Sequence, residues 1–337
     1  MRTGNVSLVL DSVIKANTEG RHLVPFLKGA PGTAKSSLVL DAAERAGIAF
    51  LDVRLSVREP VDLIGAMQVK NGKTIYAPPA WLPTEGRGIL FFDEYAQAML
   101  AMMNAAGQLL YERRIGDYNL PAGWIIVLAS NRRQDRAGTT TVPQQINNRC
   151  IHINVEVRFD DWVTDYATKV GIDWRVIHFL DQRQELMSKP SPDAEAFPSL
   201  RTWEYVSSIL TMDLPSQIME EMIMGTVGEG AGAEFIRSLR VMDSIPPWRD
   251  VFTKPTECPV PENVAALYAL MSVLAINATT KTMKALTTYL SRCPSEMSAV
   301  CMHTIGRVQP GLKETKAYTD WALNNHVAKP ATAANPF

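Results

Sequence analysis

Apolar residues follow two different patterns along the chain, and the change falls near residue 158. Before it, continuous apolar runs occur at residues 23–27, 88–92 and 124–129, and two further strand-like segments occur at 49–55 and 151–155. Short continuous runs are typical of strands buried on both faces, as in parallel sheets. After residue 158, apolar positions recur at helical spacing instead. The pattern predicts an α/β region followed by an all-helical region.

The helical part divides further where prolines gather. Prolines cluster at residues 245–247 and 255–261 and indicate a boundary or linkers there. We therefore expect a core at 1–158 that opens with an amphipathic helix at 6–16, a helical domain at 159–244, a C-terminal helical region at 245–327 and a mobile tail at 328–337. The expected helices cover residues 160–170, 174–187, 201–212, 216–227, 233–241, 262–278, 279–291 and 295–307, and the glycines of 225–232 predict a flexible interruption.

Two segments of the core carry the signals of hairpins. Residues 67–76 contain Asn71-Gly72 between β-forming residues, which is a strong signal for a tight turn that joins two strands. Residues 113–121 show a weaker signal of the same kind. We expect two hairpins that project from the core, and a mechanical role and a plain surface role both stay open for them.

A glycine-rich turn follows the first expected strand and precedes a helix-like stretch. It consists of Gly29, Ala30, Pro31, Gly32, Thr33, Ala34, Lys35, Ser36 and Ser37. Strand, turn and helix in this order form the context of a phosphate-binding loop, in which backbone N–H groups and the helix N-terminus hold phosphate oxygens. We expect Lys35 to reach the outer phosphates and the Ser36 hydroxyl to ligate Mg²⁺. Ala34 replaces a glycine of the general pattern, and its methyl group fits if φ is negative there.

Polar side chains also end two other buried strands. Asp93 and Glu94 follow the run at 88–92, and Asn131 follows the run at 124–129. The carboxyl ends of parallel strands meet at one edge of the sheet, where open α/β folds bind ligands. We expect Asp93 to hold the Mg²⁺ shell, Glu94 to polarise the attacking water and Asn131 to help hold that water. The alternative is that Asp93 and Glu94 form an ordinary acidic turn exposed to solvent. The phosphate-type loop upstream, at residues 29–37, favours a functional role for them.

Arg149 lies directly before the last expected strand. An arginine at this position is suited to act on a phosphate bound by the neighbouring subunit, as arginine fingers do. Considered alone, an arginine at this position is more often an ordinary surface arginine. A site divided between two subunits would require a ring-like homo-oligomer.

Taken together, these segments resemble the MoxR-type AAA+ ATPases over about residues 20–240. The loop at 29–36 is similar to their phosphate loop, including the alanine before the lysine, and Glu59–Gly65 resembles the segment after their second strand. The ends of the two buried strands, at residues 92–94 and 130–131, resemble their Walker B end and their sensor 1. Arg149 falls in the arginine-finger region, although the adjacent Cys150 stands where the family more often has an aromatic residue.

The resemblance also covers the helical domain and implies a role for it. Phe197–Trp203 is similar to the sensor 2 segment of the family, with Arg201 in the arginine place. Residues 159–244 would then form a lid over the nucleotide, from which Arg201 acts in cis. The implied catalytic residues are Glu94, Asn131, Arg149 and Arg201, and the implied cofactors are ATP and Mg²⁺.

The same resemblance implies an architecture and partners. The expected fold is an AAA+ P-loop core with a central parallel sheet in the order 5-1-4-3-2, two hairpin insertions, a helical lid and a C-terminal helical region. The hairpins would face the pore or the partner side of a ring, most simply a hexamer. Relatives of this group remodel or activate a protein client, together with a partner that carries a von Willebrand factor A domain.

Composition limits the other partners. Lys and Arg together number 34 and Asp and Glu 35, which gives a formal charge of −1, so no strong global field directs the chain to nucleic acid or membrane. No apolar stretch approaches the length of a membrane span. The four cysteines (Cys150, Cys258, Cys293 and Cys301) lack metal-binding spacing. We expect reduced thiols in a cytoplasmic protein.

Two other functions stay open on the sequence. One is a nucleic-acid-associated NTPase motor, whose sign would be a basic, aromatic-bearing hairpin; Lys70, Lys73 and Tyr76, or Arg113, Arg114 and Tyr118, would supply it. The other is a scaffold that binds nucleotide without productive turnover. The intact Asp93-Glu94 pair argues against the scaffold.

Overall fold

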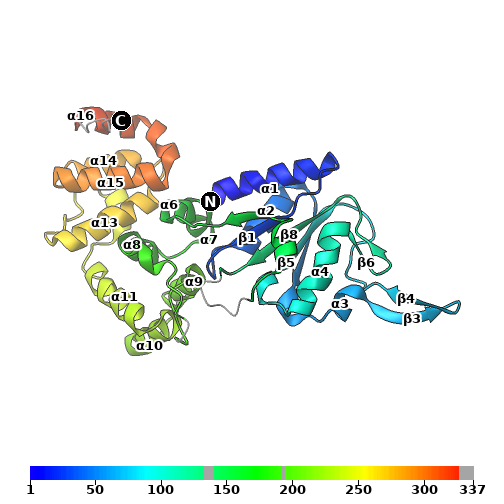
Figure 1. Ribbon diagram of the computed structural model, residues 1–337. Coiled ribbons are helices and arrows are strands. Elements are labelled where there is room, and N and C mark those ends of the chain that lie inside the picture. The colour runs from blue at the N-terminus through cyan, green and yellow to red at the C-terminus, as the bar shows by residue number, and fades with distance from the viewer. Residues whose placement is uncertain (133–139, 192–193, 326–337) are drawn as a thin grey trace, which may run out of the picture. The chain divides into compact units, whose positions relative to one another are not determined.

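The computed structural model describes residues 1–132, 140–191 and 194–325, and the tail expected at 328–337 lies outside these ranges. Contacts divide the chain into two compact units, which Figure 1 shows in blue to green and in green to red. Of the described residues, the first unit comprises those up to 158 together with 190, 191 and 194, and the second comprises 159–189 and 195–325. None of the described helices is both long enough and apolar enough to cross a bilayer.

The first unit is built on a five-stranded parallel sheet. Its strands are β1 (Pro25–Lys28), β2 (Ala49–Arg54), β5 (Gly88–Asp93), β8 (Trp124–Ser130) and β9 (Ile151–Asn154). They pair in parallel in the order β2-β5-β8-β1-β9. Numbered within the sheet and read from the other side, this is the order 5-1-4-3-2. The expected fold class, an α/β core with a central parallel sheet in this order followed by a helical region, is confirmed.

Helices cover both faces of this sheet (Figure 1). The helices of the first unit are α1 (Thr3–Thr18), α2 (Lys35–Ala46), α3 (Val61–Ile64), α4 (Leu100–Glu112) and α5 (Gln144–Asn147). Along β5, Ile89 and Phe91 pack in a cluster with α1 and α2, whereas Leu90 and Phe92 pack in a cluster with α4. Successive side chains of a strand point to opposite faces. Burial on both faces therefore requires an apolar residue at every position, which explains the continuous apolar run.

Both expected hairpins are present. The first joins β3 (Ala66–Lys70) to β4 (Lys73–Ala77), and the second joins β6 (Arg114–Ile115) to β7 (Tyr118–Asn119). The turn of the first hairpin has φ of 53° at Asn71 and 72° at Gly72. Two successive positive φ angles match the twist of the flanking strands, and Asn-Gly is the pair that adopts them most readily.

The second unit is helical throughout. Its helices are α6 (Phe159–Trp162), which continues through a π-helical stretch (Val163–Ala167) into α7 (Thr168–Val170), then α8 (Trp174–Gln182), α9 (Leu200–Ile209), α10 (Ser216–Val227), α11 (Glu229–Met242), α12 (Trp248–Thr253), α13 (Val264–Asn277), α14 (Met283–Leu290), α15 (Ser295–Val308) and α16 (Lys316–Asn324). Phe179, Trp203 and Phe235 pack in tilted and edge-to-face contacts, with ring centroids 5.2 to 5.4 Å apart, among α8, α9 and α11. A second cluster forms around the buried helix α13.

The prediction of a flexible interruption at residues 225–232 is wrong. Helix α10 runs unbroken to Val227, Gly228 alone breaks the helix with φ of 85°, and α11 begins at Glu229. Gly232 lies inside α11, where an added Cβ would come within 2.8 Å of the Met224 Cα. This glycine therefore allows α10 and α11 to pack closely and does not loosen the chain.

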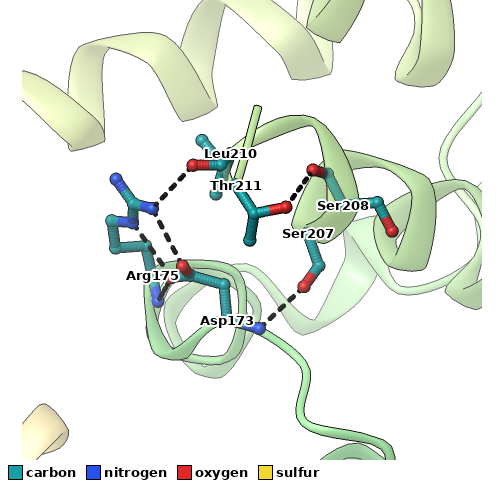
Figure 2. Close-up of polar contacts among 6 residues, drawn as sticks. All are labelled: Asp173, Arg175, Ser207, Ser208, Leu210 and Thr211. Atoms are coloured by element: carbon teal, nitrogen blue, oxygen red, sulfur yellow. Dashed lines mark hydrogen bonds and ion pairs between the residues drawn. The ribbon is translucent and has the colours of Figure 1, made fainter. Parts of the chain in front are cut away.

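Figure 2 shows the polar contacts that fix the start of α8. The Asp173 carboxylate caps the helix by accepting from the Arg175 backbone N–H at 2.8 Å, and it also accepts from Arg175 Nη2 at 2.8 Å. The Asp173 N–H donates to Ser207 Oγ at 2.8 Å. The Arg175 guanidinium further donates to the Leu210 carbonyl at 3.5 Å. These contacts attach the start of α8 to the end of α9.

Asp173→Ala should lower the free energy of local unfolding at the start of α8 by about 1–3 kcal/mol, because the helix loses its cap and a half-buried guanidinium loses its partner. Asp173→Asn is the matched control, since asparagine still caps a helix and only the charge is lost. Hydrogen exchange of the amides at residues 174–177 measures this local unfolding in both variants. Exchange rates in Asp173→Ala equal to those of the unchanged protein would contradict the assignment.

Candidate nucleotide-binding site

The turn between β1 and α2 folds tightly on itself. An added Cβ on Gly29 would lie 2.6 Å from Thr33 Oγ1, so glycine is needed there. The Thr33 hydroxyl donates to the Ala30 carbonyl at 2.8 Å. Helix α2 begins at Lys35, and among the described residues no side chain caps it. Its first backbone N–H groups thus remain for another acceptor, which is the arrangement that binds phosphate at a helix N-terminus.

Lys35 lies over this turn and is 8% exposed. Its ammonium donates to the Gly29 and Ala30 carbonyls, each at 3.1 Å, and to Asn131 Oδ1 at 3.2 Å. A buried ammonium requires acceptor oxygens, and these oxygens hold the side chain at the mouth of the turn. Asn131, at the end of β8, is therefore positioned beside Lys35, which brings the loop and the end of β8 together as the sequence predicted.

The condition on which the Ala34 methyl group was expected to fit, a negative φ, is not met. Its φ is 57° and its ψ is 26°, in the left-handed region. The chain must reverse direction at this point to enter α2, and the left-handed conformation makes that reversal. Such a conformation is costly for a residue with a Cβ, so Ala34 carries strain where glycine would carry none.

Ser36 and Asp93 meet across the carboxyl edge of the sheet. The Ser36 hydroxyl donates to Asp93 Oδ2 at 3.1 Å, and the other oxygen, Oδ1, accepts from the Glu94 N–H at 2.8 Å. Hydroxyl and carboxylate oxygens are the ligands that Mg²⁺ prefers, usually with water and phosphate completing the shell. The residues present therefore fit Mg²⁺. No group of three or more His, Cys, Asp or Glu side chains within the described ranges is arranged to hold a metal by itself.

The Glu94 carboxylate has partners that the sequence interpretation missed. Glu94 has a left-handed backbone with φ of 54°. Its Oε2 accepts a hydrogen bond from the Ser56 hydroxyl, and its Oε1 lies 3.7 Å from Arg54 Nε. Arg54 ends β2 and Ser56 follows it, and β2 pairs with β5 with Arg54 opposite Asp93. The sheet order, in which β2 neighbours β5, is the signal that would have pointed to them.

Negative charge gathers at this edge of the sheet. Burial raises the pKa of Asp52, and the charges of Asp93 and Glu94 raise it further, while Arg54 opposes them. Asp52 lies on β2, next to the strand that ends in Asp93. A pKa raised by neighbouring carboxylates shows a local negative potential, which a bound cation would relieve.

Arg149 lies at the opposite edge of the sheet. It follows α5 and precedes β9, so it lies just before the amino end of β9. The carboxyl end of β9 pairs with Lys28, the last residue of β1, and it is from that end that the phosphate-type loop begins. The strand alone separates the two edges by about 10 Å at the usual rise per residue. Arg149 is exposed, and its guanidinium carbon lies 4.0 Å from the centroid of the Tyr111 ring. The structure therefore does not bring Arg149 to the loop of its own subunit.

Arg201 belongs to the second unit. It is exposed in the first turn of α9, behind a capping box formed by Ser199 and Thr202. Burial and Glu204 raise the pKa of the nearby Tyr166 to about 12, and Arg201 opposes that rise. The action of Arg201 on a nucleotide held by the first unit stays a prediction.

Comparisons with known proteins give a likeness of fold alone. No family model and no curated protein matches the chain. A solved structure of a RuvB mutant from Thermotoga maritima is 16% identical, with 81% of this chain and 82% of that chain covered and a TM-score of 0.45. NtrX from Brucella abortus, solved in complex with ADP, is 15% identical, with 93% and 68% covered and a TM-score of 0.41. At these scores the site must be argued from its own geometry.

Ala34→Gly should stabilise the first unit by up to about 1 kcal/mol, because glycine adopts positive φ without the steric cost that a Cβ brings. Ala30→Gly in the same turn is the control: Ala30 is not among the positive-φ residues, so glycine there should destabilise. Thermal unfolding of the two variants and of the unchanged chain gives the comparison. A lower melting temperature for Ala34→Gly would contradict the strain at Ala34.

Proposed function

We propose that this protein is a Mg²⁺-dependent ATPase of the AAA+ type, similar to the MoxR group, that assembles into a hexameric ring. The observation that carries the proposal is the contact between Ser36 and Asp93 beneath a phosphate-type loop. This contact joins an expected Mg²⁺ ligand on α2 to one on β5, while Lys35 stands beside them. A chance glycine turn would give no reason for these groups to converge.

In this proposal each residue at the edge has a separate task. Ser36 and Asp93 would hold Mg²⁺, which when bound would neutralise charge on the phosphates. Lys35 exchanges carbonyl oxygens for phosphate oxygens, and the backbone N–H groups at the start of α2 bind the rest. Glu94 would turn away from Ser56 and Arg54 to accept a proton from the attacking water, because Asp93, the other carboxylate at this strand end, is engaged by Ser36. Asn131 orients that water.

The location of Arg149 supports a site shared between subunits. A guanidinium at the far edge of the sheet is of no use to its own loop, but it suits the γ-phosphate of a neighbour in a ring. Arg201, from the helical lid, would complete the site in cis. We also propose domain boundaries at 158, 244 and 327, of which the first coincides with the division between the two units.

The first hairpin favours a protein client. By the β3–β4 register, Met67, Val69 and Tyr76 share one face, and their exposed fractions are 68%, 78% and 39%. Exposed apolar side chains on a projecting strand pair are suited to contact a polypeptide. A partner with a von Willebrand factor A domain and a cytoplasmic location complete the proposal. Stimulation of hydrolysis by nucleic acid would instead favour the motor.

Lys35→Ala should abolish nucleotide binding, because the Lys35 ammonium is the cation held over the loop itself and its charge neutralises the outer phosphates. Glu94→Gln should keep ATP and Mg²⁺ bound while turnover falls by about 10²–10⁴-fold, since an amide cannot take up the proton. Binding of a fluorescent ATP analogue and release of phosphate measure the two effects. Glu85→Gln, an exposed glutamate near the other end of β5, is the control and should change neither. Normal turnover in Glu94→Gln would refute the assignment.

Arg149→Ala should bind ATP normally and lose turnover, because the finger acts only on the neighbour's site, where such residues contribute roughly 10³–10⁵-fold. Mixed with Glu94→Gln subunits, it should recover part of the rate at interfaces that join an intact Glu94 to an intact Arg149. Arg87→Ala, an exposed arginine at the same edge of the sheet, is the control. Normal turnover in assembled Arg149→Ala rings would show that Arg149 is not a finger.

A further inference from the structure

The Arg149 guanidinium rests on an aromatic ring from a distant part of the chain. Its central carbon lies 4.0 Å from the centroid of Tyr111, which is on the last turn of α4. This is well within the distance at which a cation is attracted to the face of a ring. The next residue, Cys150, packs against the core, and burial raises the pKa of its thiol to about 11. The support for Arg149 therefore comes from α4.

The Tyr111 ring is itself held in place. Its side chain is half-buried and packs against the cluster beneath α4. An added Cβ on Gly107, one turn earlier, would lie 3.4 Å from Ile146 of α5 and 3.5 Å from the Tyr111 hydroxyl. Helices α4 and α5 thus meet at Gly107, and Arg149 follows α5 by two residues. The ring and the arginine are fixed to the same contact between helices.

The ring face, more than the hydroxyl, explains why a tyrosine is useful here. The hydroxyl is buried and has no hydrogen-bond partner at close range within the described part of the chain. Burial raises the pKa of Tyr111, and the Arg149 side chain, which lies near the hydroxyl as well as against the ring, lowers it by its polar contact and its charge. A phenylalanine would present the same face to the guanidinium, whereas an aliphatic side chain would present none.

We propose that Tyr111 is a positioning residue for Arg149. An exposed arginine samples many rotamers, and stacking on a fixed ring confines it to the few that extend from this edge of the sheet toward a neighbouring subunit. The proposal rests on the proposed function, in which Arg149 acts in trans. Tyr111 touches no nucleotide, so it affects turnover only through the subunit that supplies the arginine.

The test uses mixed rings of two kinds of subunit. Arg149→Ala subunits keep Glu94 and supply the active site, and Glu94→Gln subunits keep Arg149 and supply the finger. Tyr111→Leu in the finger-supplying subunit should lower the recovered kcat by roughly 2- to 30-fold, the range expected for a lost cation–π contact, with KM for ATP unchanged. The same substitution in the site-supplying subunit should leave the recovered rate as it was. Tyr111→Phe in the finger-supplying subunit should also leave it as it was.

Each other outcome has a distinct meaning. Equal losses from Tyr111→Leu in both kinds of subunit would show that Tyr111 only supports the fold, and would overturn the positioning role. Full recovery with Tyr111→Leu in the finger-supplying subunit, or a loss with Tyr111→Phe equal to that with Tyr111→Leu, would overturn it as well. If the mixture without any Tyr111 change recovers nothing, the shared site fails, and the positioning role fails with it.

Discussion

Burial of the parallel sheet on both faces is the constraint on which the rest of the first unit depends. Phe91 and Phe92 are each fully buried, on opposite faces of β5. Burying a side chain of this size stabilises the fold by about 1.5–3 kcal/mol, and a charged group in its place would be strongly unfavourable. Polar chemistry is therefore excluded from the strands and confined to their ends. Because the strands are parallel, the ends that carry Asp93 and Asn131 lie beside the turn that carries Lys35.

The same constraint gives the two edges of the sheet different roles. The carboxyl edge collects the loop, the carboxylates and the amide, and two of the non-glycine residues with positive φ, Ala34 and Glu94, occur there. Strained backbone is often found where side chains must be aimed, and here it lies at the start of α2 and directly after β5. The amino edge of the sheet carries Arg149 with its supporting ring. In the proposed ring, one subunit would therefore present different edges to its two neighbours.

The sequence predicted the elements of the core well because its signals are local. Continuous apolar runs revealed the strands, and Asn71-Gly72 revealed a hairpin, since both depend on residues that are adjacent in the chain. The contacts of Ser56 with Glu94 and of Tyr111 with Arg149 were not predicted, because each joins residues 38 positions apart. Gly232 was misinterpreted for a related reason: a glycine that admits a neighbouring helix has the same local appearance as a glycine that loosens the chain. The sign of φ at Ala34 depends on the exit angle of the loop, which composition does not record.

The hydrogen bonds of Lys35 have a consequence for the energetics of binding. Its ammonium already has oxygen partners within the folded chain, at Gly29, Ala30 and Asn131. These oxygens keep the loop in shape before any phosphate arrives, so little chain entropy has to be lost when one does. In the proposed function, the arrival of a phosphate would be an exchange of acceptors at one cation, in which the gain is the difference between a charged oxygen and a neutral one. A neutral ligand of the same shape would gain nothing from that exchange, so the loop would select for charge before it selects for shape.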